Sequence, residues 1–143
     1  MENIAIYKIS KKSITFLRIS IGIIYFWFGA LKFFHGYSPA EDLAINTINK
    51  LTFGLVPMPY NINILAFWEC LVGLLLMFGF YIKIALILLF VHMICTFLPF
   101  FFFPDLSFNI MPYGFSLVGQ YIMKNIIIIC ASYIIWQTVE EKS

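Results

Sequence analysis

The fold of this chain is decided by two apolar stretches separated by only three residues. Residues 62–80 read INILAFWECLVGLLLMFGF, and residues 84–103 read IALILLFVHMICTFLPFFFF. The hydrocarbon core of a bilayer is about 30 Å thick, so a spanning helix needs about 20 apolar residues, and both stretches are long enough. Because lipid cannot bond with backbone amides, both must be helices rather than strands. Pro99 and Pro104 predict that the second of these helices bends or ends near residues 100–103.

Two further apolar stretches, residues 14–34 and 117–137, complete an all-α integral membrane four-helix bundle, a single domain over residues 1–143. The composition agrees: 62% of the residues are hydrophobic and 11% are charged, whereas a soluble domain has about 45–50% apolar and about 25% charged residues. Such a chain is not disordered, not a nucleic-acid-binding module and not an ordinary cytosolic enzyme. The partner that the composition requires is the lipid bilayer.

The distribution of positive charges predicts the orientation. Most of them flank one side of the predicted spans: Lys8, Lys11, Lys12, Arg18, Lys83 and Lys142. The opposite side has Lys50 in a loop, with Lys32 and Lys124 near the outer ends of their helices. Positive residues gather on the cytoplasmic side, so we expect both termini to be cytoplasmic. The first stretch lacks an A-x-A-like cleavage site and is longer than a signal-peptide core, which predicts a retained span.

The connection between the first two spans contains a predicted helix of its own, over about residues 39–52. Ser38 and Glu41 have the spacing of a capping box, with a proline between them. The residues that follow place an apolar face on one side: Ala44, Ile48, Leu51 and Leu55. We expect a short amphipathic helix at the outer membrane interface, packed as a connector rather than moving as a lid.

Small residues on the first span indicate which of its faces is buried. Gly22, Tyr25, Gly29, Lys32 and Gly36 alternate three and four residues apart, so they share one face of a helix. Small residues let a neighbouring helix backbone approach closely. We therefore expect this stripe, with its tyrosine and lysine, to face the inside of the bundle.

Ionisable residues within the spans are expensive to insert, so they indicate function by default. Glu69 lies seven residues into the second predicted span, and Lys124 lies seven residues into the fourth. At 1.5 Å per residue both are roughly 10 Å below the outer edge. We therefore expect an ion pair between Glu69 and Lys124, with Lys32 above it near the outer end of the first span.

Other polar residues on the third and fourth spans extend this cluster into a candidate ligand-binding site. Its predicted members are Lys32, Glu69, His92, Gln120, Lys124 and Asn125. Two lysines against one glutamate leave an excess positive charge, which favours a small anion or the polarisable carbonyl of a quinone. The alternative is structural: Glu69 and Lys124 fix the helix register, Lys32 extends outward, and His92 bonds a neighbour.

The sequence contains few signals for other cofactor chemistry. Two histidines, His35 at the outer surface and His92 roughly 13 Å deeper, are poorly placed to hold one haem. No metal-ligand spacing, phosphate-binding loop or C-x-x-C pair is present. The spacing therefore favours neither a metal nor haem nor thiol exchange, and a quinone stays the cofactor to consider. No complete catalytic set is found, so whether the chain is an enzyme stays open.

Several of these residues lie in runs that resemble a known family. Residues 18–22 (RISIG) and 27–33 (WFGALKF), together with Trp68-Glu69, His92-Met93 and residues 119–125 (GQYIMKN), resemble the DoxX-like family of small bacterial membrane proteins. The resemblance covers about residues 18–136. It implies a four-helix bundle in the bacterial cytoplasmic membrane. Some members are the small subunit of a thiosulfate:quinone oxidoreductase, and others accompany the maturation of methylamine dehydrogenase.

Three functions follow as hypotheses. The first is a redox-linked membrane protein whose outer-half pocket binds a quinone or a small sulfur oxyanion. The second is a non-catalytic accessory subunit that stabilises a larger membrane complex. The third is a transporter of a small solute, which the scarcity of polar residues in the inner half disfavours. Whether the chain works with a partner subunit or as a homo-oligomer stays open.

Overall fold

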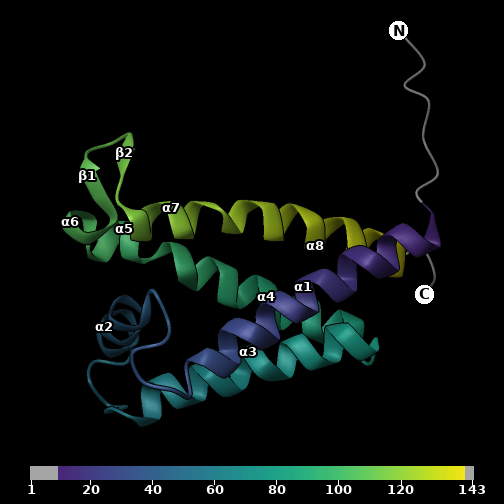
Figure 1. Cartoon of the computed structure of the whole chain (residues 1–143), viewed down its shortest axis with the longest axis horizontal. Coiled ribbons are helices and arrows are strands. Elements are labelled where there is room, and N and C mark those ends of the chain that lie inside the picture. Colours follow the sequence, from purple (N-terminus) through teal and green to yellow (C-terminus); the bar gives the residue numbers. More distant parts are fainter. Residues whose placement is uncertain (1–9, 141–143) are drawn as a thin grey trace, which may run out of the picture.

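The computed structural model describes residues 10–140, which form an elongated bundle of helices (Figure 1). Four helical segments in this part of the chain are long and apolar enough to cross a membrane: Lys11–Leu31, Tyr60–Phe78, Ile82–Phe102 and Leu117–Glu140. They confirm the predicted four-helix membrane bundle. The first helix, α1 (Lys11–Leu31), begins before residue 14 because the Ser10 hydroxyl caps it, accepting a hydrogen bond from the Lys12 N–H at 3.3 Å.

Two of the four spans are interrupted. The second span is the single helix α3 (Tyr60–Phe78), whereas the third consists of α4 (Ile82–Phe97) and α5 (Pro99–Phe102). This interruption was predicted from Pro99, which has no N–H to continue the helical hydrogen bonds. The fourth span consists of α7 (Leu117–Met123) and α8 (Asn125–Glu140), which meet at Lys124. That second interruption was not predicted.

The two ends of the bundle are built differently. At one end, here called the terminal end, α1 begins and α8 finishes (Figure 1). The opposite end, here called the α2 end, carries the remaining elements: α2 (Glu41–Leu51), α6 (Pro104–Ser107), β1 (Phe108–Ile110) and β2 (Gly114–Phe115). The two strands form an antiparallel hairpin that the sequence did not predict. The α2 end therefore holds most of the non-spanning structure.

Helix α2 is not capped in the way that the sequence predicted. Its N-cap is Ala40, and no side chain caps the helix start, so the predicted Ser38 capping box was wrong. The Glu41 carboxylate turns toward the preceding loop instead. It accepts a hydrogen bond from the Gly36 N–H at 2.8 Å and contacts the His35 ring. The carboxylate thus holds the loop before α2, and the position of α2 at the membrane interface stays a prediction.

Helices α1 and α3 approach each other closely along a seam of glycines. A Cβ atom on Gly73 would lie 2.5 Å from the backbone nitrogen of Phe26, and one on Gly22 would lie 2.8 Å from the Gly73 carbonyl oxygen. A Cβ atom on Gly29 would also lie 2.8 Å from the α3 backbone. The predicted stripe is thus confirmed at Gly22 and Gly29. Gly36 does not belong to it, because it lies beyond the helix end with a φ of 84° and open space around it.

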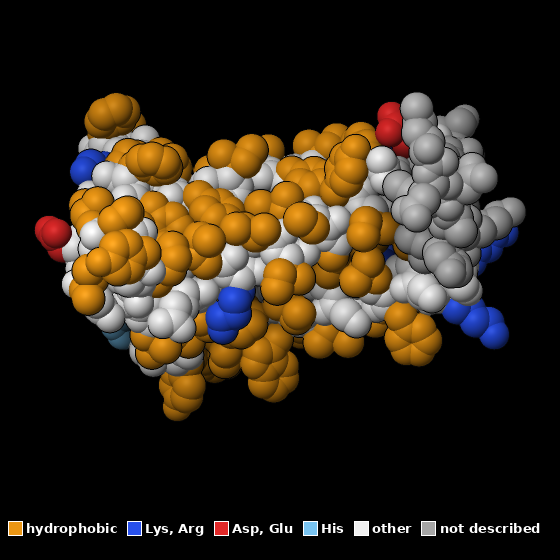
Figure 2. All heavy atoms as spheres, turned by 90° about the horizontal axis from the view of Figure 1, so that it is seen from above, with side chains coloured by type: hydrophobic (Ala, Val, Ile, Leu, Met, Phe, Trp, Pro, Cys, Tyr) orange, Lys and Arg blue, Asp and Glu red, His pale blue; other side chains and the backbone are white. Residues whose placement is uncertain are grey.

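The core lies between the spanning helices, and the outside of the bundle is apolar. Seven apolar core residues of the described part of the chain are fully buried: Ala66, Val72, Leu76, Ala85, Leu86, Leu89 and Ile135. Large apolar side chains are exposed along the middle of the bundle, and Figure 2 shows orange patches over much of this face, with charged groups mainly toward the two ends. A soluble protein does not expose an apolar area of this extent. The surface is therefore suited to contact with lipid.

Candidate functional site

A cavity of about 510 Å³ lies in the half of the bundle toward the α2 end. Its wall comes from all four spans and from α2. Five of the six predicted site residues line it: Lys32, Glu69, His92, Lys124 and Asn125. Most of the other lining residues are apolar, among them Ile24, Leu65, Met93 and Ile128. The structure therefore brings most of the predicted polar cluster together around one space.

The central contact of the site is an ion pair between α1 and α3. The Lys32 Nζ lies 2.6 Å from the Glu69 Oε2, and only 11% and 8% of the two side chains is exposed. The same Nζ donates a hydrogen bond to the Phe28 carbonyl at 3.4 Å. Glu69 was predicted to pair with Lys124, and that prediction was wrong. The glycine seam brings α1 against α3, so the lysine of the adjacent helix takes the carboxylate.

The direction of side chains on helices explains the choice of partner. Side chains lean toward the N-terminus of their own helix. Lys32 follows the last residue of α1 and leans back into the bundle, whereas Glu69 leans toward the start of α3 at the α2 end. The two therefore lean toward each other. Lys124 follows α7, which also starts at the α2 end, so its side chain leans in the same direction as that of Glu69 and not toward it.

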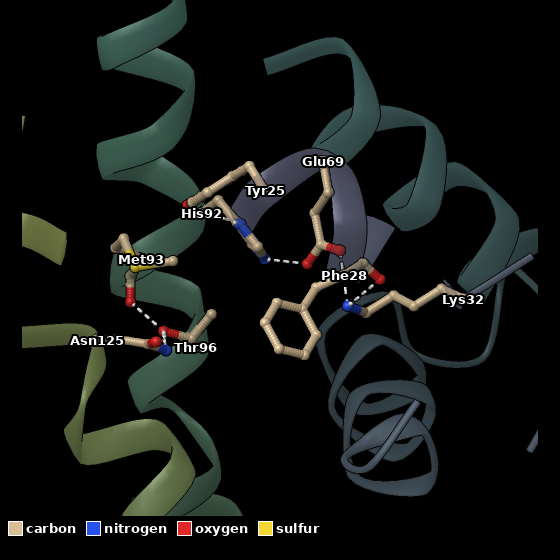
Figure 3. A network of polar contacts seen from close by, with 8 residues as sticks. All are labelled: Tyr25, Phe28, Lys32, Glu69, His92, Met93, Thr96 and Asn125. Atoms are coloured by element: carbon tan, nitrogen blue, oxygen red, sulfur yellow. Dashed lines mark hydrogen bonds and ion pairs between the residues drawn. The ribbon is translucent and has the colours of Figure 1, made fainter. Parts of the chain in front are cut away.

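A histidine and a tyrosine extend the ion pair into a network (Figure 3). The second carboxylate oxygen, Glu69 Oε1, lies 3.3 Å from His92 Nε2 on α4, and His92 Nδ1 lies 3.2 Å from the Tyr25 hydroxyl on α1. A carboxylate accepts hydrogen bonds only, so Nε2 carries the proton. Lys32 already balances the charge of Glu69, so we assign a neutral imidazole whose Nδ1 accepts from the Tyr25 hydroxyl.

A second polar group lies across the cavity, between α4 and α8. The Asn125 side-chain amide donates to the Thr96 hydroxyl at 3.2 Å, and that hydroxyl donates to the Met93 carbonyl at 2.7 Å. In Figure 3 the Phe28 ring points into the space between this group and the Glu69 network. The two polar groups therefore face one apolar space from opposite sides.

Lys124 lines the cavity without a carboxylate partner among residues 10–140. Its Nζ lies 5.0 Å from the centre of the Tyr121 ring, which is a cation–π distance, and the residue is exposed. In the described part of the chain, Glu69 is bonded to Lys32 and His92 only. Among the described residues of the site, no carboxylate balances the positive charge of Lys124.

Gln120 does not join the site. It is exposed in the first turn of α7, and its side-chain amide points to the Phe115 carbonyl at 3.5 Å. The prediction placed it beside Lys124 on one continuous helix. The Lys124 N–H still donates to the Gln120 carbonyl at 3.2 Å, so the two residues share a helix face, but both are exposed and only Lys124 lines the cavity.

The sequence reasoning missed several residues of the site. Tyr25 was placed on the inner stripe but was not selected as a site residue, although it lies seven positions from Lys32 on that stripe. Helix α2 also contributes to the cavity wall, through Leu43, Ala44, Thr47, Ile48 and Leu51. Three of these belong to the predicted apolar face. Leu55, the fourth member of that face, lies beyond the end of α2 and is exposed.

The charges around the cavity define the ligands that it can accept. The Lys32–Glu69 pair is neutral as a unit, the assigned His92 is neutral, and Lys124 adds one positive charge. A cation lining a space within the hydrocarbon region interacts strongly with a negative charge or a carbonyl dipole, because the local dielectric is low. The arrangement can therefore hold a polar acceptor group while the apolar wall contacts the rest of a ligand.

Comparison with known proteins agrees with the residue runs in the sequence. The DoxX family model matches residues 13–103, which is more than half of the 143 residues. The matched part carries Lys32, Glu69 and His92. It ends before α7, so it does not include residues 119–125. No curated protein and no solved structure matches the chain. From the family match, with four helices able to span a membrane, we conclude that this chain belongs to the DoxX family.

Proposed function

We propose that this chain is a redox-linked membrane protein whose cavity binds the headgroup of a quinone. One observation carries the proposal: a largely apolar cavity within a membrane bundle has an unbalanced cation, Lys124, in its wall. Ligand pockets of about 300–1,000 Å³ hold a compact organic molecule, typically through an apolar wall and a few polar groups. The volume of about 510 Å³ lies within that range.

The polar residues have distinct roles in this proposal. Lys124 donates a hydrogen bond to one quinone carbonyl and stabilises the negative charge that the ring gains on reduction. The Tyr25, His92 and Glu69 hydrogen bonds fix the opposite wall and offer groups that can exchange protons. Lys32 holds the Glu69 carboxylate in place. The Asn125 amide, already bonded to Thr96, lies near Lys124 in sequence and lines the same wall.

Binding of a tailless quinone tests the proposal directly. We suggest calorimetric titration of the detergent-purified protein with duroquinone, whose ring is fully substituted and does not add to thiols. Lys124→Met is expected to weaken binding by roughly tenfold, the effect of losing one charged hydrogen bond. The matched control is Lys12→Met, an exposed lysine in the first turn of α1 that does not line the cavity. Equal binding by the two variants, or no binding by the native protein, contradicts the proposal.

The excess charge also supports a second candidate ligand, a small sulfur oxyanion. Lys32 and Lys124 both line the cavity, and the single carboxylate of Glu69 balances only one of these two positive charges. An anion in the cavity therefore gains a favourable electrostatic interaction. Against it, most of the wall is apolar and offers an oxyanion few hydrogen bonds. Adding thiosulfate to the duroquinone titration separates the two ligands, because thiosulfate displaces the quinone only if it occupies the same site.

We also propose a location and orientation. The location is the cytoplasmic membrane of a bacterium, and both termini face the cytoplasm. Support comes from Lys11, Lys12, Arg18 and Lys83, which belong to the first turns of α1 and α4 or lie near them, toward the terminal end. Lys8 and Lys142, which contributed to the same prediction, lie outside the described residues.

An accessory role beside a partner subunit stays the alternative function. A polypeptide that co-purifies with the native protein but not with Glu69→Ala would support it.

A further inference from the structure

Two apolar residues that the spanning helices contribute to the cavity wall also belong to the outer surface of the bundle. Ile24 on α1 and Ile127 on α8 both line the cavity, and 42% and 71% of these residues is exposed. Most other lining residues of the spanning helices are buried or half-buried. A residue that faces both the cavity and the outside marks a place where the wall is thin or open. The geometry thus points to a lateral window between α1 and α8.

The window lies at a depth where only lipid is available. Ile24 is seven residues before the end of α1, and Ile127 is ten residues after the start of α7. At 1.5 Å per residue, these positions are roughly 10 and 15 Å from the ends of their spans at the α2 end. Both lie well inside a hydrocarbon core of about 30 Å. The cavity thus opens toward acyl chains rather than toward water at this point.

The window has limits on both sides. Toward the α2 end, the Phe28 ring on α1 contacts the Tyr121 ring on α7, with centroids 5.7 Å apart. Toward the terminal end, α1 and α8 contact each other, and Ile21 on α1 and Ser132 on α8 are buried. Lys124, also exposed, stands on the α8 side of the window, close to Tyr121. An opening of this kind admits a narrow apolar chain beside a cation.

We propose that the ligand of the cavity is a quinone with a long apolar chain that enters from the bilayer through the window between Ile24 and Ile127. The headgroup occupies the cavity beside Lys124, and the chain passes between α1 and α8 into the lipid. This inference rests on the proposed quinone site and adds the class of quinone and its route. It follows that the chain, and not the headgroup alone, contributes to binding.

A photoreactive chain maps the route in the full-length protein reconstituted in phosphatidylcholine nanodiscs. The probe is a duroquinone headgroup in which a decyl chain, with a diazirine close to the ring, replaces one methyl group. Mass spectrometry of the irradiated protein is expected to find the label on residues 21–28 and 124–131. An excess of the same quinone without the diazirine is expected to suppress the labelling.

A pair of tryptophan variants completes the test. Ile127→Trp narrows the window, so binding of the decyl quinone is expected to weaken by roughly tenfold more than binding of duroquinone does. The matched control is Ile126→Trp, because Ile126 is exposed on the same turn but does not line the cavity. If duroquinone binds but the label falls on α3 or α4, or Ile127→Trp behaves like Ile126→Trp, the window is wrong and the quinone site stands. If neither quinone binds, both proposals are wrong.

Discussion

The Lys32 ammonium on α1 lies 2.6 Å from the Glu69 carboxylate on α3, and the pair is almost completely buried. The second oxygen of the same carboxylate lies 3.3 Å from His92 Nε2 on α4. One carboxylate thus joins three of the four membrane spans within the site. The stability of the bundle and the shape of the cavity depend on the same residue.

Removing the buried partner of Glu69 should destabilise the protein more than removing the exposed lysine of the site. Lys32→Met leaves a buried carboxylate without its cation, at an expected cost of about 3–5 kcal/mol in the free energy of unfolding. Lys124→Met removes an exposed side chain and should change that free energy by about 0.5 kcal/mol or less. Unfolding in mixed micelles of a mild detergent and dodecyl sulfate measures both values.

A double variant tests whether the loss comes from the stranded charge. Lys32→Met combined with Glu69→Gln removes both charges, so it should recover much of the stability that Lys32→Met loses. The pairing described above is contradicted if Lys32→Met and Lys124→Met lose the same free energy, because that result would place both lysines equally near the carboxylate.

The imidazole of His92 should be neutral and protonated at Nε2. Its Nε2 faces the Glu69 carboxylate and its Nδ1 faces the Tyr25 hydroxyl. Nitrogen-15 NMR of histidine-labelled protein distinguishes the two neutral tautomers from the imidazolium. His92 and His35 are the two histidines of the chain, so His35→Gln assigns the spectrum. In Tyr25→Phe we expect the Nδ1 resonance to shift and the protonated Nε2 to persist. A protonated Nδ1 in the native protein would contradict the assignment.

A methyl group added at the glycine seam should separate α1 from α3. The Cβ atom of Gly73→Ala would lie 2.5 Å from the Phe26 backbone nitrogen, which is too close for any side-chain carbon. Overpacking of this kind costs about 1–3 kcal/mol. Thermal unfolding in detergent measures the effect, with Leu74→Phe as the control that adds bulk on the exposed side of the same helix. Equal midpoints for the two variants would show that the seam is not tightly packed.

Loss of Lys50 should loosen α2 over the cavity. The Lys50 Nζ lies 5.0 Å from the Phe102 ring centre and 5.2 Å from that of Phe103, which links α2 to the end of the third span. Exposed cation–π contacts contribute about 0.5–1 kcal/mol each. Lys50→Met is therefore expected to raise amide hydrogen exchange in residues 41–51 several-fold, and Lys12→Met is not. Unchanged exchange in Lys50→Met would mean that other contacts hold α2, such as the 3.0 Å hydrogen bond from Asn61 to Asn49.

The position of the polar residues along each span could be predicted from the sequence, but their pairing could not. Depth follows from counting residues in a helix of known rise, and the cavity does collect Glu69, His92 and Lys124 at one end of the bundle. Pairing depends on which helices are neighbours and on how each one is rotated. The interruption of the fourth span at Lys124 has neither proline nor glycine as a signal.

The sequence by itself determined that the chain forms four membrane helices, since apolar stretches of this length have no stable alternative to a helix in lipid. It also determined which face of α1 lies against a neighbouring helix, and the tertiary structure showed that this neighbour is α3. Only the tertiary structure decided that Glu69 bonds Lys32 and His92, that Lys124 is left unbalanced, and that α2 covers the cavity. The physical reason is that hydropathy acts on each segment separately, whereas an ion pair requires two side chains from different helices to lean toward the same point.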